Sequence, residues 1–281
     1  MDKKNDKRLA LSLIFLAIGI AANSILGPFV SGVVTYPFSE SVRNMTIGLD
    51  AVSLILVAPI GVLAARYIYL GKQIGFIAAL SLSAYAMYTF VQFIMGPQYI
   101  EYSPIVLLHL GLFILSGFIL VNAWQRIKGN ELPHFNQRKN KTSAIVLFLL
   151  AIFTSLSYIA SIPQIFMGGT IPATYMEDPT VYWSIFLLDL GFVLPITITV
   201  SVGLLKNKAF AQKAVFGMAG WYTLVVGSVA AMFVVMFLNG DSNVDGVTVI
   251  LLLSAFLLIV LFSVWVWQSL IVHRKRLQKD Q

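Results

Sequence analysis

Long blocks of apolar residues alternate with short polar segments along the chain. Each block has roughly 20 or more residues, which is the length that a helix needs to cross a bilayer. The pattern therefore predicts an all-α integral membrane protein with eight transmembrane helices. We expect these spans at residues 9–34, 46–66, 73–96, 104–124, 143–165, 181–205, 214–238 and 247–270.

The composition agrees with a membrane protein. Of 281 residues, 58% are hydrophobic and 11% are charged, whereas a soluble globular chain is about 25% charged. The mean hydropathy is +0.85. The chain has no cysteine, so disulfides, thiolate metal sites and cysteine nucleophiles are excluded.

The positions of the basic residues predict the orientation. When alternate connections are assigned to one side of the membrane, that side holds 18 of the 19 Lys and Arg residues, and only Arg43 lies opposite. Because basic residues near span ends stay in the cytoplasm, we expect a multi-pass protein of the cell membrane with both termini cytoplasmic. Topology thus explains the net charge of +7, and we expect no nucleic-acid partner. The basic segment 125–142 also suits anionic lipid headgroups.

The chain divides into two similar halves. Residues 1–125 form the first four-span half, 126–142 a basic cytoplasmic linker, and 143–281 the second half with a basic tail. Each half has an Asp and then a Pro in its second span, a Tyr-Thr pair in its third, and Trp-Gln at the end of its fourth. With an even number of spans per half, the copies would be two parallel four-helix repeats, related by an axis along the membrane normal.

Two aspartates stand inside apolar spans. Asp50 precedes Pro59 in the second span, and Asp189 precedes Pro195 in the sixth. A charged side chain at a helix centre costs roughly 2.5–3.5 kcal/mol on insertion scales, so such residues usually face the bundle interior. One interpretation is a polar site, to which each proline adds a carbonyl freed from helix bonding. The other is that each Asp only hydrogen-bonds a neighbouring helix.

Further polar and aromatic residues are candidates for the same site. Some share a helical face with one of these acids, and others lie at the same expected depth in the membrane. The topology places Asp50, Asp189 and His109 in the outer half of the membrane, where they could line one outward-facing pocket. His109 is the only histidine within a span, which favours a packing role over a metal site. We predict no catalytic residue, no metal and no cofactor. The remaining ligand-binding or proton-linked candidates are Ser53, Tyr85, Tyr88, Gln92, Tyr158, Trp221 and Tyr222.

The two Asp-containing stretches carry a resemblance to a known group. Gly48-Leu-Asp-Ala-Val-Ser-Leu, followed by Pro59, and Asp189-Leu-Gly, followed by Pro195, resemble a group of bacterial multi-spanning membrane proteins with no assigned function. The resemblance covers roughly residues 46–238. It implies a common fold and no activity.

The sequence favours one function over two alternatives. The buried acids, the prolines and the repeat favour a small-solute or ion transporter with a polar site in the outer half of the membrane. One alternative is an intramembrane enzyme that acts on a lipid through an Asp and His109, although no hydrolase or metalloprotease motif is present. The other is a non-catalytic sensor or assembly partner. The expected partners are the lipid bilayer and an unknown small molecule or ion, with homo-oligomerisation left open.

Overall fold

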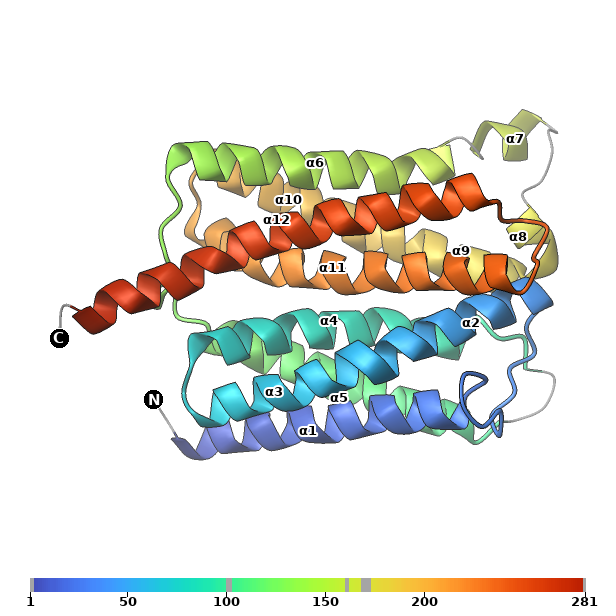
Figure 1. Ribbon diagram of the computed structural model, residues 1–281, viewed down its shortest axis with the longest axis horizontal. Helices are drawn as coiled ribbons and strands as arrows, with labels where there is room; N and C mark the ends of the chain where they lie inside the picture. The colour runs from blue at the N-terminus through green and yellow to red at the C-terminus, as the bar shows by residue number, and fades with distance from the viewer. Residues whose placement is uncertain (1–2, 100–102, 160–161, 168–172, 280–281) are drawn as a thin grey trace.

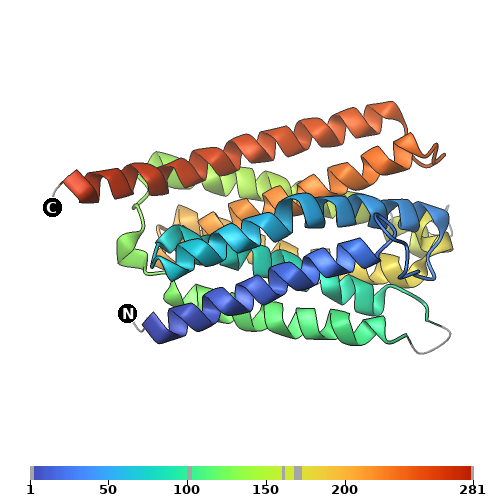
Figure 2. The ribbon, with the colours of Figure 1, turned by 60° about the horizontal axis from the view of Figure 1, so that its bottom comes forward.

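The computed structural model describes residues 3–99, 103–159, 162–167 and 173–279. All of the regular secondary structure in these ranges is helical. Eight helices are long and apolar enough to cross a membrane, which supports a multi-pass membrane protein. They lie side by side, with both ends of the chain at the same end of the bundle (Figures 1 and 2).

The first four spans form the lower part of the bundle in Figure 1. Helix α1 (Lys3–Leu26) packs on α3 (Ala58–Tyr69) and on α5 (Ile105–Arg126). The second span is one continuous helix made of α2 (Glu40–Val52), the π-helical turn η1 (Ser53–Val57) and α3. Helix α4 (Gln73–Met95) packs against α3 and α5.

The last four spans form the upper part of the bundle. They are α6 (Gln137–Ile159), the composite α9 (Pro179–Leu188), η3 (Asp189–Val193) and α10 (Leu194–Leu205), then α11 (Ala209–Leu238) and α12 (Gly246–Lys279). The 3-10 turn η2 (Gly129–Glu131) lies between the halves. Two short helices, α7 (Ile162–Met167) and α8 (Ala173–Glu177), follow α6 and precede α9 along the chain.

The helix bounds differ from the predicted spans mainly at the polar ends. The first span was expected to reach residue 34, but α1 ends at Leu26, because Gly27-Pro28 follows and Gly32 has a φ of +61°. Conversely, α6 begins at Gln137, inside the polar segment that we predicted to be linker. Polar residues extend helices beyond the apolar core because helix geometry does not require apolar side chains at the ends.

Both composite spans contain a π-helical turn immediately before a proline. Pro59 and Pro195 stand two residues after η1 and η3. A proline has no backbone N–H and clashes with the carbonyl four residues earlier, here Ile55 or Gly191, so the chain widens locally to a π turn. The backbone N–H of Ala58 bonds the carbonyl of Ser53, and that of Leu194 bonds the carbonyl of Asp189.

The region from η1 to the start of α4 has the same helix pattern as the region from η3 to the start of α11. The first residues of corresponding elements are 136 positions apart (189 minus 53, for example). This holds for η1 and η3, for α3 and α10, and for α4 and α11. The positive φ of Gly71 is matched at that offset by Asn207, the one non-glycine residue with positive φ in the described ranges.

The two halves meet through α2, α4, α9 and α11. Helix α11 packs on α2 and α4, and α4 also packs on α9. Gly48 permits a close approach of two backbones, because a Cβ there would lie 2.5 Å from the backbone N and Cα of Met232 on α11. The Ser81 hydroxyl of α4 donates to the Gly217 carbonyl of α11 at 2.9 Å. The core is therefore continuous across both halves.

The outer surface of the bundle is apolar. Every span exposes at least one large apolar side chain, with exposed fractions from 47% for Phe237 to 67% for Leu258 among these examples. Such a continuous apolar surface is expected where lipid tails, rather than water, surround the protein. The examples, one per span, are Phe15, Ile55, Met95, Ile114, Phe153, Phe192, Phe237 and Leu258.

Candidate functional site

Asp50 is a buried acid without a hydrogen-bond partner for one of its oxygens. It lies in the last turn of α2 and its residue is 1% exposed. Asp50 Oδ2 and the Ser24 hydroxyl on α1 lie close enough to interact but outside hydrogen-bond geometry, and neither has another partner among the described residues. Buried polar atoms are almost always satisfied in proteins, so these two mark an unusual position.

A small cavity of about 10 Å³ adjoins Asp50. That volume is close to the minimum that holds one water molecule. Its walls come from α1, α2, η1 and α4, and they combine polar atoms with aromatic rings. The lining residues are Ile20, Asn23, Ser24, Asp50, Ser53, Tyr85, Ala86, Thr89, Phe90 and Phe93.

Gly27 allows the Asp50 carboxylate to approach the end of α1. A Cβ built on Gly27 would overlap Asp50 Oδ2. The Gly27 N–H donates to the carbonyl of Asn23 at 2.8 Å. The Asp50 carboxylate therefore lies directly against the backbone at the end of α1. A side chain at position 27 would displace the carboxylate.

A chain of hydroxyl groups runs from the Asp50 cavity to the second half of the protein. The Ser53 hydroxyl lies 3.1 Å from the Tyr85 hydroxyl, which lies 2.9 Å from the Ser228 hydroxyl on α11. Tyr85 is 2% exposed. Because hydroxyls both donate and accept, the hydrogens along this chain can point in either direction.

His109 is enclosed by aromatic rings, and it contacts three residues that line the same cavity, Asn23, Phe90 and Phe93. Its Nε2 lies 2.8 Å from Asn23 Oδ1 and 3.2 Å from the Tyr36 hydroxyl. The buried Nδ1 has no partner among the described residues. Phe90 and Phe93 stack on the ring with centroids 5.8 Å and 5.2 Å away.

Tyr36 reaches this cluster from the connection between α1 and α2. Its ring stacks on Phe93 at 5.1 Å, and the residue is 9% exposed. Burial, together with the nearby charge of Asp50, raises the pKa of the Tyr36 phenol well above its usual range, so the hydroxyl keeps its hydrogen. Tyr36 thus packs against Phe93, whose ring lines the cavity, and against His109.

Asp189 has a different environment, in which both carboxylate oxygens are bonded. The Tyr88 hydroxyl of α4 donates to Oδ1 at 2.7 Å, and the Tyr158 hydroxyl of α6 donates to Oδ2 at 2.7 Å. The Trp221 ring meets Tyr88 edge-on, with centroids 5.7 Å apart. Asp189 therefore links its own helix to α4 and α6. This agrees with the interpretation that the aspartate only hydrogen-bonds neighbouring helices.

The other candidates lie near the second cluster. The Tyr222 hydroxyl lies 2.7 Å from the Thr197 hydroxyl of α10. Its ring also meets that of Trp221 at 4.9 Å. Gln92 is half-buried one turn beyond Tyr88 on α4, which places both on the same face of that helix.

The structure assigns the two acids to separate clusters. Ser53, Tyr85 and His109 gather around Asp50, whereas Tyr88 and Tyr158 gather around Asp189. Asp189 does not line the Asp50 cavity. At the offset of 136 positions, the counterpart of Asp189 is Ser53, and the counterpart of Asp50 is Phe186. When the helix bounds are aligned in this way, the two acids therefore lie three positions, or about one turn, apart.

Sequence reasoning missed Tyr36 and Ser228. Tyr36 belongs to a connection between spans, and nothing in Tyr36-Pro37-Phe38 indicates that the ring points into the bundle. Ser228 is an isolated hydroxyl in an apolar helix, and only the packing of α11 on α4 brings it to Tyr85. Asn23 and Ser24 were recognisable, since they share a polar face near the end of the first span.

The fold and the buried polar clusters define a polytopic membrane protein. Comparison with protein-family models, curated proteins and solved structures finds no match for this chain.

Proposed function

We propose that this chain is a transporter of a small solute or ion in the cell membrane, and that Asp50 binds the cation that drives it. One observation carries the proposal: a buried carboxylate oxygen without a partner faces a cavity of about one water's size, beside an equally unpartnered hydroxyl. Acids inside membrane spans mark ion and proton pathways in pumps and transporters. A proton or a small monovalent cation would satisfy Asp50 Oδ2 and Ser24 together.

The helix arrangement supports a transporter built from two parallel repeats. In the proposed repeat, the second span of each half packs on the third span of the other, as α2 packs on α11 and α9 on α4. The two third spans, α4 and α11, pack on each other. Such reciprocal contacts are what a two-fold axis along the membrane normal requires. In this proposal, the repeat also explains why the π turns and helix bounds of the two halves are separated by one common offset.

The orientation in this proposal places the Asp50 cavity in the outer half of the bilayer. It rests on the 18 of 19 basic residues that fall on one side. Tyr36 then separates the cavity from the extracellular water, since it lies in an outer connection and stacks on Phe93. A π turn beside each proline is a local weakness in helix bonding, and such turns often occur at functional sites. The second span could bend there as the cavity opens.

The test is a transport assay in liposomes that contain a pH-sensitive dye. A panel of amino acids, sugars, organic acids and monovalent salts is added outside the liposomes, and the internal pH is recorded. We expect at least one solute to move protons or to dissipate an imposed pH gradient, and Asp50→Asn to abolish that movement. Asp189→Asn is the matched control and should keep at least part of it, because Asp189 is tied to Tyr88 and Tyr158. Unchanged movement in Asp50→Asn would contradict the role of Asp50.

A further inference from the structure

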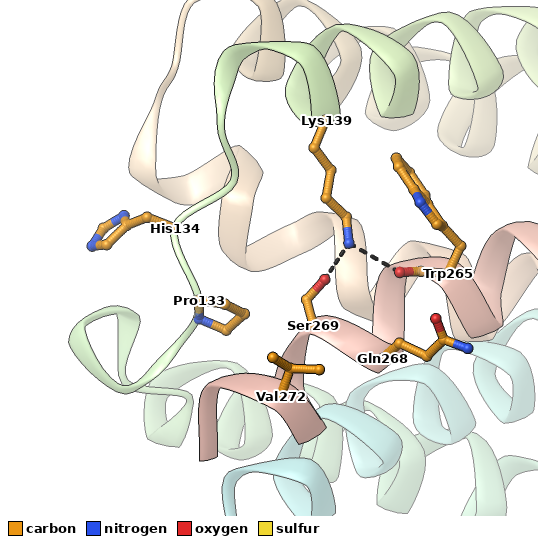
Figure 3. Close-up of a pocket in the computed structure, with 7 residues that line it drawn as sticks. All are labelled: Pro133, His134, Lys139, Trp265, Gln268, Ser269 and Val272. Carbon is orange, nitrogen blue, oxygen red and sulfur yellow. Dashed lines mark hydrogen bonds between the residues drawn. The ribbon is translucent and has the colours of Figure 1, made fainter. Parts of the chain in front are cut away.

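The same corner of the bundle is built differently in the two halves. At the end of the bundle that holds the termini, the first half joins α1 to α5 by an ion pair between Asp6 and Arg126. In the second half the equivalent helices are α6 and α12, and a pocket of about 360 Å³ lies between them (Figure 3). The lining residues are Pro133, His134, Lys139, Trp265, Gln268, Ser269 and Val272.

Lys139 supplies a cation to this pocket without an acid to balance it. Its Nζ donates to the Trp265 carbonyl at 2.9 Å and to the Ser269 hydroxyl, and it lies over the rings of Phe135 and Trp265. No lining residue is acidic. Of the two ion pairs found in the described part of the chain, neither includes Lys139. At the offset of 136 positions, Asp6 falls on Thr142, which carries no charge.

The pocket offers several hydrogen-bond donors to an anion. An ammonium group has three N–H donors, so Lys139 retains one after its two bonds to Trp265 and Ser269. The Ser269 hydroxyl accepts from Lys139 and keeps its own hydrogen for another acceptor. The Gln268 side chain adds an amide at the same wall, and Figure 3 shows Lys139 and Ser269 pointing toward each other beside it. A phosphate oxygen is the acceptor that such a charged set of donors favours.

The surroundings of the pocket point to a lipid as the source of the phosphate. Lys139 lies two residues into α6, which is the level of the membrane interface for a span that begins there. Tryptophan is typical of that level, and Trp265 and Val272 are exposed on α12 at 37% and 51%. The same stripe continues toward the bilayer centre through Leu261 and Leu258, exposed at 57% and 67%. Positions 258, 261, 265 and 272 share one helical face.

We propose that the pocket between α6 and α12 binds the headgroup phosphate of an anionic phospholipid. Lys139 and Ser269 hold the phosphate, and the acyl chains lie along the stripe of Leu258 and Leu261. The lipid supplies to the second half the negative charge that Asp6 supplies to the first. The comparison with Asp6 rests on the proposed repeat. The lipid site itself does not depend on transport, because the lysine, the pocket and the apolar stripe involve other residues, at the opposite end of the spans.

The test measures thermal unfolding of the full-length protein in detergent micelles with increasing phosphatidylglycerol. We expect phosphatidylglycerol to raise the unfolding midpoint of the wild-type protein more than zwitterionic phosphatidylcholine does. Lys139→Gln should need about tenfold more phosphatidylglycerol for half of the effect, since it loses one charge-assisted hydrogen bond. Lys141→Gln is the matched control, because it removes the same charge from an exposed neighbour on α6, and it should respond as the wild type does.

Two further variants keep the test decisive if Lys139→Gln does not fold. Lys139→Arg keeps the cation and should keep the preference for phosphatidylglycerol. Ser269→Ala keeps the cation but loses a donor, and should weaken the response about threefold to tenfold. The proposal is overturned if phosphatidylcholine or inorganic phosphate stabilises the protein as well as phosphatidylglycerol does. It is also overturned if neither Lys139→Gln nor Ser269→Ala changes the response.

Discussion

The different bonding of the two buried aspartates predicts opposite effects on stability. Asp189 accepts a hydrogen bond from Tyr88 and another from Tyr158, each at 2.7 Å. In Asp189→Asn the amide oxygen keeps one of these bonds, while the NH2 group faces a tyrosine hydroxyl that had donated. Interhelical hydrogen bonds in membrane proteins contribute about 0.6 kcal/mol on average and up to about 1.7. We therefore expect Asp189→Asn to lower the free energy of unfolding by about 0.6–1.7 kcal/mol.

Asp50→Asn should not destabilise the protein. No hydrogen bond holds Asp50 Oδ2, and a charge inside a span costs up to roughly 2.5–3.5 kcal/mol on insertion scales. The neutral amide has nearly the same shape and leaves the neighbouring helices in place. We expect the free energy of unfolding to stay the same or to rise, which is the usual sign that a residue is retained for function at a cost in stability.

The assay is equilibrium unfolding in mixed micelles with increasing denaturing detergent, followed by tryptophan fluorescence and circular dichroism. Tyr158→Phe is the control for Asp189, because it removes one donor and no charge. The double variant of Tyr158→Phe and Asp189→Asn should lose less than the sum of the two single losses, since both remove the same bond. A loss of 1 kcal/mol or more in Asp50→Asn, or no loss in Asp189→Asn, would refute the reasoning.

Three further predictions follow from the packing and the topology. Gly48→Ala places a Cβ 2.5 Å from the backbone of α11 and should lower the free energy of unfolding by about 1–3 kcal/mol; an unchanged unfolding midpoint would show that α2 and α11 separate easily. Tyr36→Ala should open the cavity, so that a water-soluble carbodiimide added outside labels Asp50 faster by mass spectrometry; equal labelling in the wild type would contradict the covering role of Tyr36. A reporter fused after Gln281 should read cytoplasmic and one inserted at Asp241 external, and the reverse result would invert the proposed orientation.

The pattern of apolar residues was sufficient to predict the eight long helices. Each of the eight predicted spans corresponds to a helix long enough to cross a membrane, because a bilayer leaves few other ways to satisfy the backbone of a long apolar block. The third span was predicted at 73–96 and is Gln73–Met95. The ends were less predictable where polar residues continue the helix, as at the start of α6.

The candidate site was only partly predictable. The sequence singles out Asp50 and Asp189, since an acid within an apolar span is conspicuous. It does not distinguish them, because their difference lies in partners that come from other helices. Tyr88 and Tyr158 are distant in sequence from Asp189, and no periodicity within one helix shows that both hydroxyls converge on its carboxylate.

The sequence by itself determined how many helices are long and apolar enough to cross a membrane and roughly where each lies, since these depend on local hydrophobicity and on the length of each block. Only the tertiary structure decided how the carboxylate oxygens of the two acids are bonded, that Tyr36 packs against Phe93 and His109, and that a lysine rather than an ion pair occupies the corner between α6 and α12. The physical reason is that helix–helix packing depends on the rotation and tilt of each helix. These are set by close contacts such as Gly48 on α11 and Gly27 on Asp50, which no single span encodes.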